Sequence, residues 1–154
     1  MLPGVGAGRL LAPDLIGMGR SGKPDIGYSF DDHARYLDEW VDALGLENVV
    51  MVGHDWGGAL AFDWAARHPD RVAGIAFAES IVKPMSWDEL SPQARARSER
   101  VRGDDGEKMA DWCASHIAAL EIVDCGKAGH HAPEDRPGEI AAAISDWADR
   151  HSLR

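Results

Sequence analysis

VVMVGHDWGGAL, residues 49–60, is the stretch of this 154-residue chain that decides its fold. Its first half is an apolar run typical of a buried strand, and its second half opens an alanine-rich segment of helical character. Gly53-x-Asp55-x-Gly57 spans the junction and has the spacing of a nucleophile elbow, a sharp strand-to-helix turn whose central side chain projects alone. Glycines flank such a strained turn because a Cβ on either side would collide with the neighbouring elements. The stretch therefore predicts a strand, a turn at Asp55 and a helix.

A carboxylate at this turn allows two interpretations. As a nucleophile, Asp55 would displace a leaving group at carbon and form an alkyl ester, not the acyl-enzyme of a serine hydrolase. The backbone N–H of Trp56, at the start of the expected helix, would favour a nearby anion. As a structural residue, Asp55 would be only the N-cap of that helix. The spacing alone leaves both interpretations open.

Apolar runs and helical segments alternate on either side of this turn. The expected strands are Arg9–Asp14, Asn48–His54, Val72–Glu79 and Leu120–Cys125, and the expected helices are Asp31–Leu44, Ala59–Arg67 and Gly138–Arg150. The helices are predicted from apolar residues at three- and four-residue spacings. Strands that alternate with helices indicate βαβ units and a mainly parallel sheet flanked by helices. The predicted fold class is therefore α/β.

Two regions interrupt this alternation. Gly17–Ser29 is a loop rich in Gly, Pro and Ser, and it leads into a helix that Ser29 or Asp31 could cap. Lys83–Ala119 contains expected helices but no strand, so we predict an insertion over the sheet. These helices are Ser86–Arg102 and Glu107–Ala118, with a polar hinge at Gly103–Gly106. Loops at the carboxyl ends of parallel strands are where such sheets bind ligands.

The composition is that of one soluble globular domain, with 45% hydrophobic residues and 27% charged residues. Sixteen basic and 26 acidic residues give a net charge of −10, which disfavours nucleic acid and anionic membranes as partners. No apolar run is long enough to span a bilayer and no leader is evident, so we expect a cytoplasmic protein. Cys113 and Cys125 fit neither a disulfide framework nor a metal knuckle.

Three further residues could act together with Asp55. His130 and His131 follow the last expected strand, where an imidazole could serve as a base near neutral pH, although exposed loop residues are the simpler interpretation. Glu79 ends the expected strand Val72–Glu79 and could orient an imidazole, as the acid of a catalytic triad does. It could equally be a solvated carboxylate at a strand end.

Taken as a set, the motifs resemble the haloalkane dehalogenases of the α/β-hydrolase superfamily. They are RLLAPDLIGMG at 9–19 with Ser21 and Lys23-Pro24, Asp32-His33 with Tyr36-Leu37, GHDWGGALAF at 53–62, and AESI at 78–81. The segment GHDWG is shared with soluble epoxide hydrolases and haloacetate dehalogenases. The loop at 14–24 and the acid at Glu79 point to haloalkane dehalogenases and the related coelenterazine luciferases.

The resemblance implies a role for each candidate residue. Asp55 corresponds to the nucleophile, Glu79 to the acid that orients the histidine, and Trp56 to the donor of an indole N–H to the halide. His130 corresponds to the base, because it lies four residues before the motif Glu134-Asp135-Arg136-Pro137; His131 then need not be catalytic. The implied reaction is hydrolytic dehalogenation of a halogenated aliphatic substrate by water, with no metal or organic cofactor.

The chain also departs from the family pattern. It lacks the upstream strands and the His-Gly-x-Pro loop that commonly supplies a second halide donor, and the interval from Asp55 to His130 is shorter than in the family. We therefore expect a partial α/β-hydrolase core from residues 1–82 and 120–154, with residues 83–119 as a remnant of the helical cap. Two alternatives stay open: a catalytically silent truncated remnant, and an epoxide hydrolase. The second is weakened because the only tyrosines, Tyr28 and Tyr36, precede the elbow, whereas epoxide hydrolysis needs tyrosines in the cap.

Overall fold

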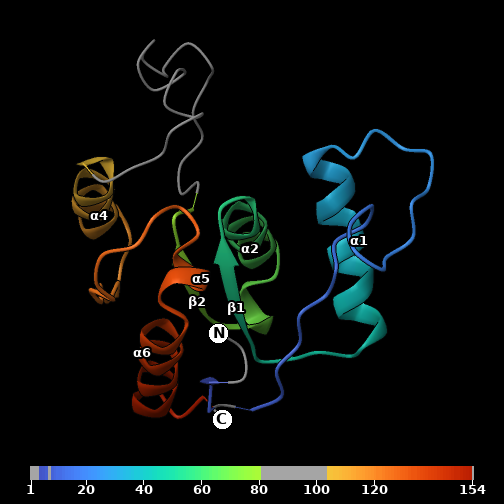
Figure 1. Cartoon of the computed structure of the whole chain (residues 1–154). Helices are drawn as coiled ribbons and strands as arrows, with labels where there is room; N and C mark the ends of the chain where they lie inside the picture. The colour runs from blue at the N-terminus through green and yellow to red at the C-terminus, as the bar shows by residue number, and fades with distance from the viewer. Residues whose placement is uncertain (1–3, 7, 81–103, 154) are drawn as a thin grey trace. The chain divides into compact units, whose positions relative to one another are not determined.

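The computed structural model describes residues 4–6, 8–80 and 104–153. The chain divides into two compact units. We call residues 8–80 the N-terminal unit and residues 4–6 with 104–152 the C-terminal unit. The helix expected at Ser86–Arg102 lies outside the described residues. Figure 1 gives the element labels used below.

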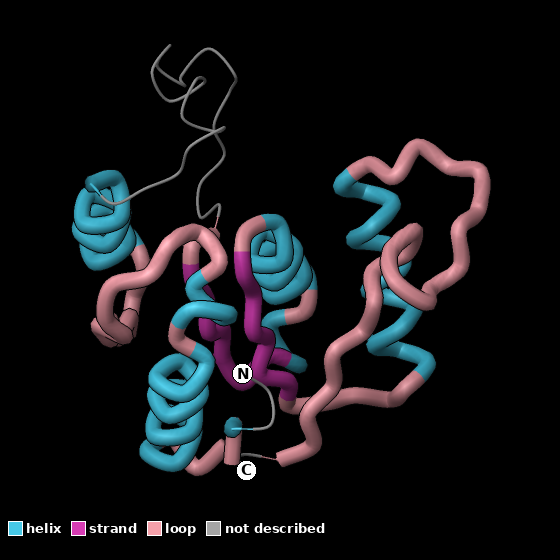
Figure 2. The backbone as a smooth tube through the Cα atoms, in the orientation of Figure 1, coloured by secondary structure: helices cyan, strands magenta, loops and turns pink. Residues whose placement is uncertain are grey.

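The N-terminal unit is built on a parallel pair of strands joined through a helix. Its elements, in chain order, are α1 (Phe30–Ala43), β1 (Val49–His54), α2 (Trp56–Arg67), the 3-10 helix η2 (Pro69–Arg71) and β2 (Val72–Ala78). Strands β1 and β2 run parallel, and their register ends with His54 opposite Ala78. Figure 2 shows the two strands side by side. This βαβ unit confirms the predicted α/β class.

Helix α1 begins where the sequence indicates a cap. Ser29 is the N-cap: its Oγ accepts the backbone N–H of Asp32 at 3.2 Å, and the Asp32 carboxylate accepts the backbone N–H of Ser29 at 3.0 Å. This reciprocal pair is a capping box, which satisfies two backbone donors that a helix start leaves without partners. Of the two caps that the sequence allowed, Ser29 is the one used.

The core of the N-terminal unit lies between α2 and its neighbours. Trp64 of α2 is fully buried, and Leu60 and Ala61 on the same helix are buried with it. The rings of Phe62 on α2 and Phe77 on β2 meet edge to face with centroids 5.0 Å apart. Aromatic pairs of this geometry add about 0.5–1.5 kcal/mol to the area they bury. Helix α2 is therefore packed against the strand pair.

Ion pairs join α1 to the end of α2 and to η2. Asp38 of α1 contacts both Arg67 and the Nε2 of His68, the latter at 3.0 Å. Arg71 donates from Nη1 to the Asp42 carboxylate at 2.6 Å and from Nη2 to the carbonyl of Leu46 at 2.9 Å. These bonds hold α1 beside α2 at the end of the helix that is remote from the elbow.

The C-terminal unit contains α4 (Asp104–His116), α5 (Ala132–Asp135) and α6 (Pro137–Arg150). Helix α6 confirms the predicted helix at Gly138–Arg150, and its buried residues are Ala141, Ile144 and Ala148. Helix α4 begins inside the expected hinge Gly103–Gly106 and ends two residues before Ala118. Glycine in a helix costs only about 1 kcal/mol relative to alanine, so Gly106 does not prevent α4 from starting early.

Two of the expected strands do not form. Arg9–Asp14 and Leu120–Cys125 are not in strand conformation, and within the described residues the sheet consists of β1 and β2 alone. No backbone hydrogen bond ties either segment to a strand in this part of the chain. Leu10 is 40% exposed and Ile122 is 56% exposed. Both predictions were wrong because an apolar run becomes a strand only when a neighbouring strand takes up its backbone N–H and C=O groups.

Candidate active site

Asp55 lies at a strained turn between β1 and α2. Its backbone has φ 53° and ψ −123°, in a region that residues with a Cβ rarely adopt. Asp55 occupies the N-cap position of α2, but its side chain makes no capping hydrogen bond. An aspartate kept only as a helix cap would use its carboxylate to accept an N–H of the first turn. The backbone confirms the predicted strand, turn and helix, and the Asp55 side chain does not cap α2.

Glycines permit this turn, but only one of the two expected glycines, Gly53, is needed for close packing. A Cβ at Gly53 would lie 2.5 Å from the Cα of Gly58 and 2.7 Å from the carbonyl oxygen of Gly57, and a Cβ at Gly58 would meet the side chain of Ser80. A Cβ at Gly57 would meet nothing within 4 Å. The predicted collision therefore holds at Gly53 and is wrong at Gly57, and Gly58 is the second glycine that close packing requires.

Glu79 lies at the same end of the strand pair as Asp55. Because His54 and Ala78 are the last paired residues, Asp55 and Glu79 are the next residues on neighbouring parallel strands. Glu79 also has a positive φ, 48°, and its side chain is exposed. The next residue, Ser80, donates from Oγ to the carbonyl of Ala78 at 3.0 Å. Two carboxylates thus share the carboxyl edge of the sheet.

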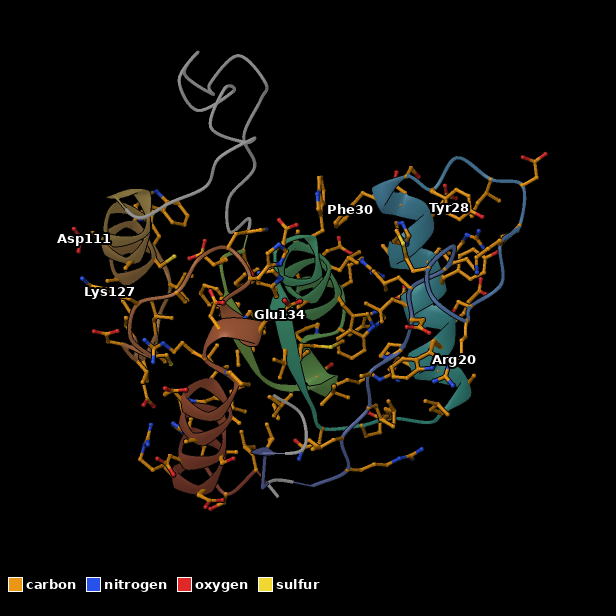
Figure 3. All side chains as sticks on the ribbon, in the orientation of Figure 1. Arg20, Tyr28, Phe30, Asp111, Lys127 and Glu134 are labelled. Atoms are coloured by element: carbon orange, nitrogen blue, oxygen red, sulfur yellow. The ribbon has the colours of Figure 1, made fainter. Side chains whose placement is uncertain are left out.

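Trp56 is the first residue of α2 and is 57% exposed. Its ring lies 6.3 Å from that of Phe30, centroid to centroid, with the two planes tilted by 47°. Phe30 is the first residue of α1, directly after the Ser29 cap. Figure 3 shows Phe30 extending from the start of α1. Phe30 could not be identified as a site residue from the sequence, because nothing in its spacing connects it with the elbow.

His130 belongs to the C-terminal unit, in the loop that leads to α5. It is half-buried, whereas the adjacent His131 is exposed, and the two rings have centroids 5.5 Å apart. The loop is held from the motif that follows it. The Asp135 carboxylate accepts the backbone N–H of Gly129 at 2.9 Å, and Arg136 donates from Nε to the carbonyl of Lys127 at 3.0 Å. Asp135 and Arg136, which belong to the motif that aligns His130 with the family, thus also hold the His130 loop.

Asp55, Trp56 and Glu79 are therefore brought together in the N-terminal unit. His130 is described in the other unit, and its pairing with Asp55 and Glu79 stays a prediction.

Neither cysteine lies in surroundings that activate a thiol. Both are free thiols, and Cys113 is buried within α4. Burial raises the pKa of the Cys113 thiol, and burial, assisted by Asp124 and Glu139, raises the pKa of the Cys125 thiol. A raised thiol pKa leaves less of the reactive thiolate at neutral pH.

The remaining features of the described residues lie away from the elbow. A pocket of about 140 Å³ opens between α1 and the loop before it, and its lining includes Asp14, His33 and Trp40 but none of the candidate residues. Across residues 4–6, 8–80 and 104–153, no cluster of three His, Cys, Asp or Glu residues could hold a metal ion. In the same ranges, no helix is both long and apolar enough to cross a membrane.

The sequence is similar to those of known α/β hydrolases. A family described as the alpha/beta hydrolase fold matches residues 8–120. A haloalkane dehalogenase of Mesorhizobium japonicum is 52% identical over 105 residues, which are 66% of this chain and 34% of that protein. One from Agrobacterium fabrum is 47% identical over 97 residues, or 63% of this chain and 32% of that protein. The chain thus spans about a third of the length of these curated relatives.

Solved structures of haloalkane dehalogenases are also similar to this chain. The crystal structure of an ancestral haloalkane dehalogenase, AncHLD2, aligns with a TM-score of 0.51 and 40% identity, covering 87% of this chain and 50% of that one. A loop variant of the haloalkane dehalogenase DbeA from Bradyrhizobium elkanii aligns with a TM-score of 0.50 and 34% identity, covering 86% and 50%.

Proposed function

We propose, from the premise that this chain belongs to the α/β-hydrolase fold family, that it hydrolyses haloalkanes through an ester on Asp55. The relatives named haloalkane dehalogenase support this choice of substrate class. In the first step, a carboxylate oxygen of Asp55 attacks the carbon that bears the halogen. The C–O bond forms as the carbon–halogen bond breaks, and the halide leaves with the bonding electron pair. The Trp56 indole N–H donates to the departing halide.

In the second step, water hydrolyses the alkyl ester. His130 accepts a proton from the water as its oxygen attacks the ester carbonyl, and Glu79 orients the imidazole and stabilises its charged form. The alcohol leaves, the Asp55 carboxylate is regenerated, and His130 releases its proton to solvent. The products are an alcohol, a halide and a proton, and the only co-substrate is water. Neither a metal nor an organic cofactor enters this scheme.

The observation that carries the proposal is the backbone of Asp55. A non-glycine residue at φ 53° and ψ −123° is strained. Strain of this kind persists where a particular side chain must project from a turn, which is what an in-line attack on carbon requires.

Epoxide hydrolysis uses the same aspartate and histidine and is the alternative enzymatic function. It also requires a phenol that protonates the epoxide oxygen. The Tyr28 hydroxyl already donates to the carbonyl of Pro24 at 2.6 Å, and the other tyrosine of the chain, Tyr36, lies on α1. No observation favours this alternative over dehalogenation.

A cytoplasmic location is part of our proposal, and the two free thiols support a reducing compartment.

Trapping the ester tests the proposal directly. The variant His130→Gln should still undergo the first displacement with 1,2-dibromoethane but should not hydrolyse the ester, because the base acts mainly in the second step. Intact-mass measurement and peptide mapping should then find a 2-bromoethyl group on Asp55.

His131→Gln is the matched control, since it removes the neighbouring imidazole from the same loop. It should accumulate no ester, and Asp55→Ala should form none. An adduct on another residue, or equal accumulation in the two histidine variants, would contradict the assignment.

A further inference from the structure

Trp56 has an aromatic neighbour whose position is fixed independently of the elbow. Phe30 is the first residue of α1, and Figure 3 shows it where α1 begins. The ring contact joins the start of α1 to the start of α2, with centroids 6.3 Å apart and a tilt of 47°. Both residues belong to the N-terminal unit. The separation and tilt fall within the range of favourable aromatic pairs.

The backbone that carries Phe30 is held from both sides. On one side, the capping box of Ser29 and Asp32 fixes the first turn of α1. On the other side, the Tyr28 hydroxyl donates to the carbonyl of Pro24 at 2.6 Å and closes the preceding loop. Phe30 therefore presents its ring from a rigid turn, and it is not a residue at the tip of a free loop.

Trp56 needs such a support. Its side chain is 57% exposed, so packing alone does not select one rotamer for the indole. A halide donor is useful only when its N–H points at the place where negative charge develops. Two side-chain torsions must be held for that, and an adjacent ring can hold them.

We infer that Phe30 is a positioning residue that orients the Trp56 indole for halide binding. The inference rests on the proposed function, since it assigns the purpose of the ring contact to the halide. Phe30 itself touches neither the carbon that is attacked nor the nucleophile in this scheme; it acts through Trp56. Losing the contact should weaken halide binding by about two- to ten-fold, the fold-change that corresponds to an aromatic pair.

The experiment uses the full chain labelled with 5-fluorotryptophan and titrated with sodium bromide. The variant Trp56→Phe identifies the fluorine resonance of Trp56 among those of the six tryptophans. Phe30→Leu keeps an apolar side chain but removes the ring. It should shift the Trp56 resonance in the absence of bromide and raise the bromide dissociation constant about two- to ten-fold. Phe30→Tyr keeps the ring and should restore both values.

Phe62→Leu is the matched control, because it makes the same change of ring to leucine on α2 at a position whose ring packs against Phe77 of β2. It should leave the Trp56 resonance and the bromide affinity unchanged even if it lowers stability. An unchanged Trp56 resonance in folded Phe30→Leu would overturn the positioning role alone. A wild-type chain that binds no bromide would overturn the proposed function, and the role of Phe30 in halide binding with it.

Discussion

Asp55 and Glu79 both have a positive φ at the ends of neighbouring strands. Their φ values are 53° and 48°, and neither residue is a glycine. Each such residue costs about 1–3 kcal/mol, and the cost is tolerated only where the surrounding structure allows no other path. Around Asp55 that constraint comes from the contact of Gly53 with Gly58 and from Ser80 packed over Gly58. The elbow therefore depends on small residues that do no chemistry.

The two glycines that flank Asp55 in sequence should respond differently to substitution. Gly53→Ala should lower the free energy of unfolding by about 1–3 kcal/mol, because its Cβ would lie 2.5 Å from the backbone of Gly58, which has no flexible end to move aside. Gly57→Ala should change it by less than about 0.5 kcal/mol, since the new methyl group would meet nothing within 4 Å. Urea unfolding of the two variants measures the difference. Equal losses would contradict the packing described here.

Among the helices and strands, the sequence correctly predicted those strands whose pairing partner lies close by in the chain. β1 and β2 form because each is the other's partner, and α2 joins them within a short span of chain. Arg9–Asp14 has the same apolar character, but it pairs with no strand within the described residues. Leu120–Cys125 likewise pairs with no strand there. Hydrophobic pattern reports burial tendency, whereas strand formation depends on a second segment that the pattern does not identify.

In the candidate site, too, some features were predictable from the sequence and others were not. The turn at Asp55 was predictable because the strand, the glycines and the helix are consecutive in sequence. The support of Trp56 by Phe30 was not, because the two residues come from different helices and meet only through tertiary packing. The bonds from Asp135 and Arg136 to the His130 loop are local, but a carboxylate or guanidinium that bonds to backbone leaves no distinctive spacing.

The start of α1 gives a prediction about acid stability. The backbone N–H of Ser29, followed by its hydroxyl, lowers the pKa of the Asp32 carboxyl in the folded chain. A carboxyl whose folded pKa lies below its unfolded value, about 3.9, stabilises the protein above that value. Its contribution is lost as pH falls through the folded pKa. Asp32→Asn should therefore be less stable than the wild type near neutral pH, and the difference should shrink below about pH 4.

Urea midpoints at a series of pH values measure this convergence. Asp31→Asn is the matched control, because Asp31 lies in the same first turn but is not part of the capping box. It should show a smaller pH-dependent difference. A gap between Asp32→Asn and the wild type that widens as pH falls would contradict the sign derived from the capping box.

For the whole molecule, the resemblance to haloalkane dehalogenases is confirmed, but the similarity covers a part of those proteins. The chain spans 34% of the relative from Mesorhizobium japonicum and 50% of the ancestral enzyme's structure. A pair of strands is marginally stable unless helices cover it, and in the N-terminal unit α2 is packed against both strands. The elbow is thus built from elements of that unit. The rate of the proposed reaction also depends on the hydrogen-bond donors and the water around the elbow.

The last prediction concerns that rate. A polypeptide of these 154 residues should release halide at least about 10² to 10³ times more slowly than the Mesorhizobium japonicum relative, the usual cost of losing one donor to a developing anion. The family resemblance implies a second donor from a His-Gly-x-Pro loop, and the 154 residues contain no such sequence. Trp56 is also 57% exposed, so water competes with the halide for the indole N–H and weakens the contact that is left. Bromide release from 1-bromobutane at neutral pH, measured for both proteins beside Asp55→Ala of this chain, gives the comparison. Turnover near about one per second that disappears in Asp55→Ala would show that a single donor at an exposed elbow is sufficient.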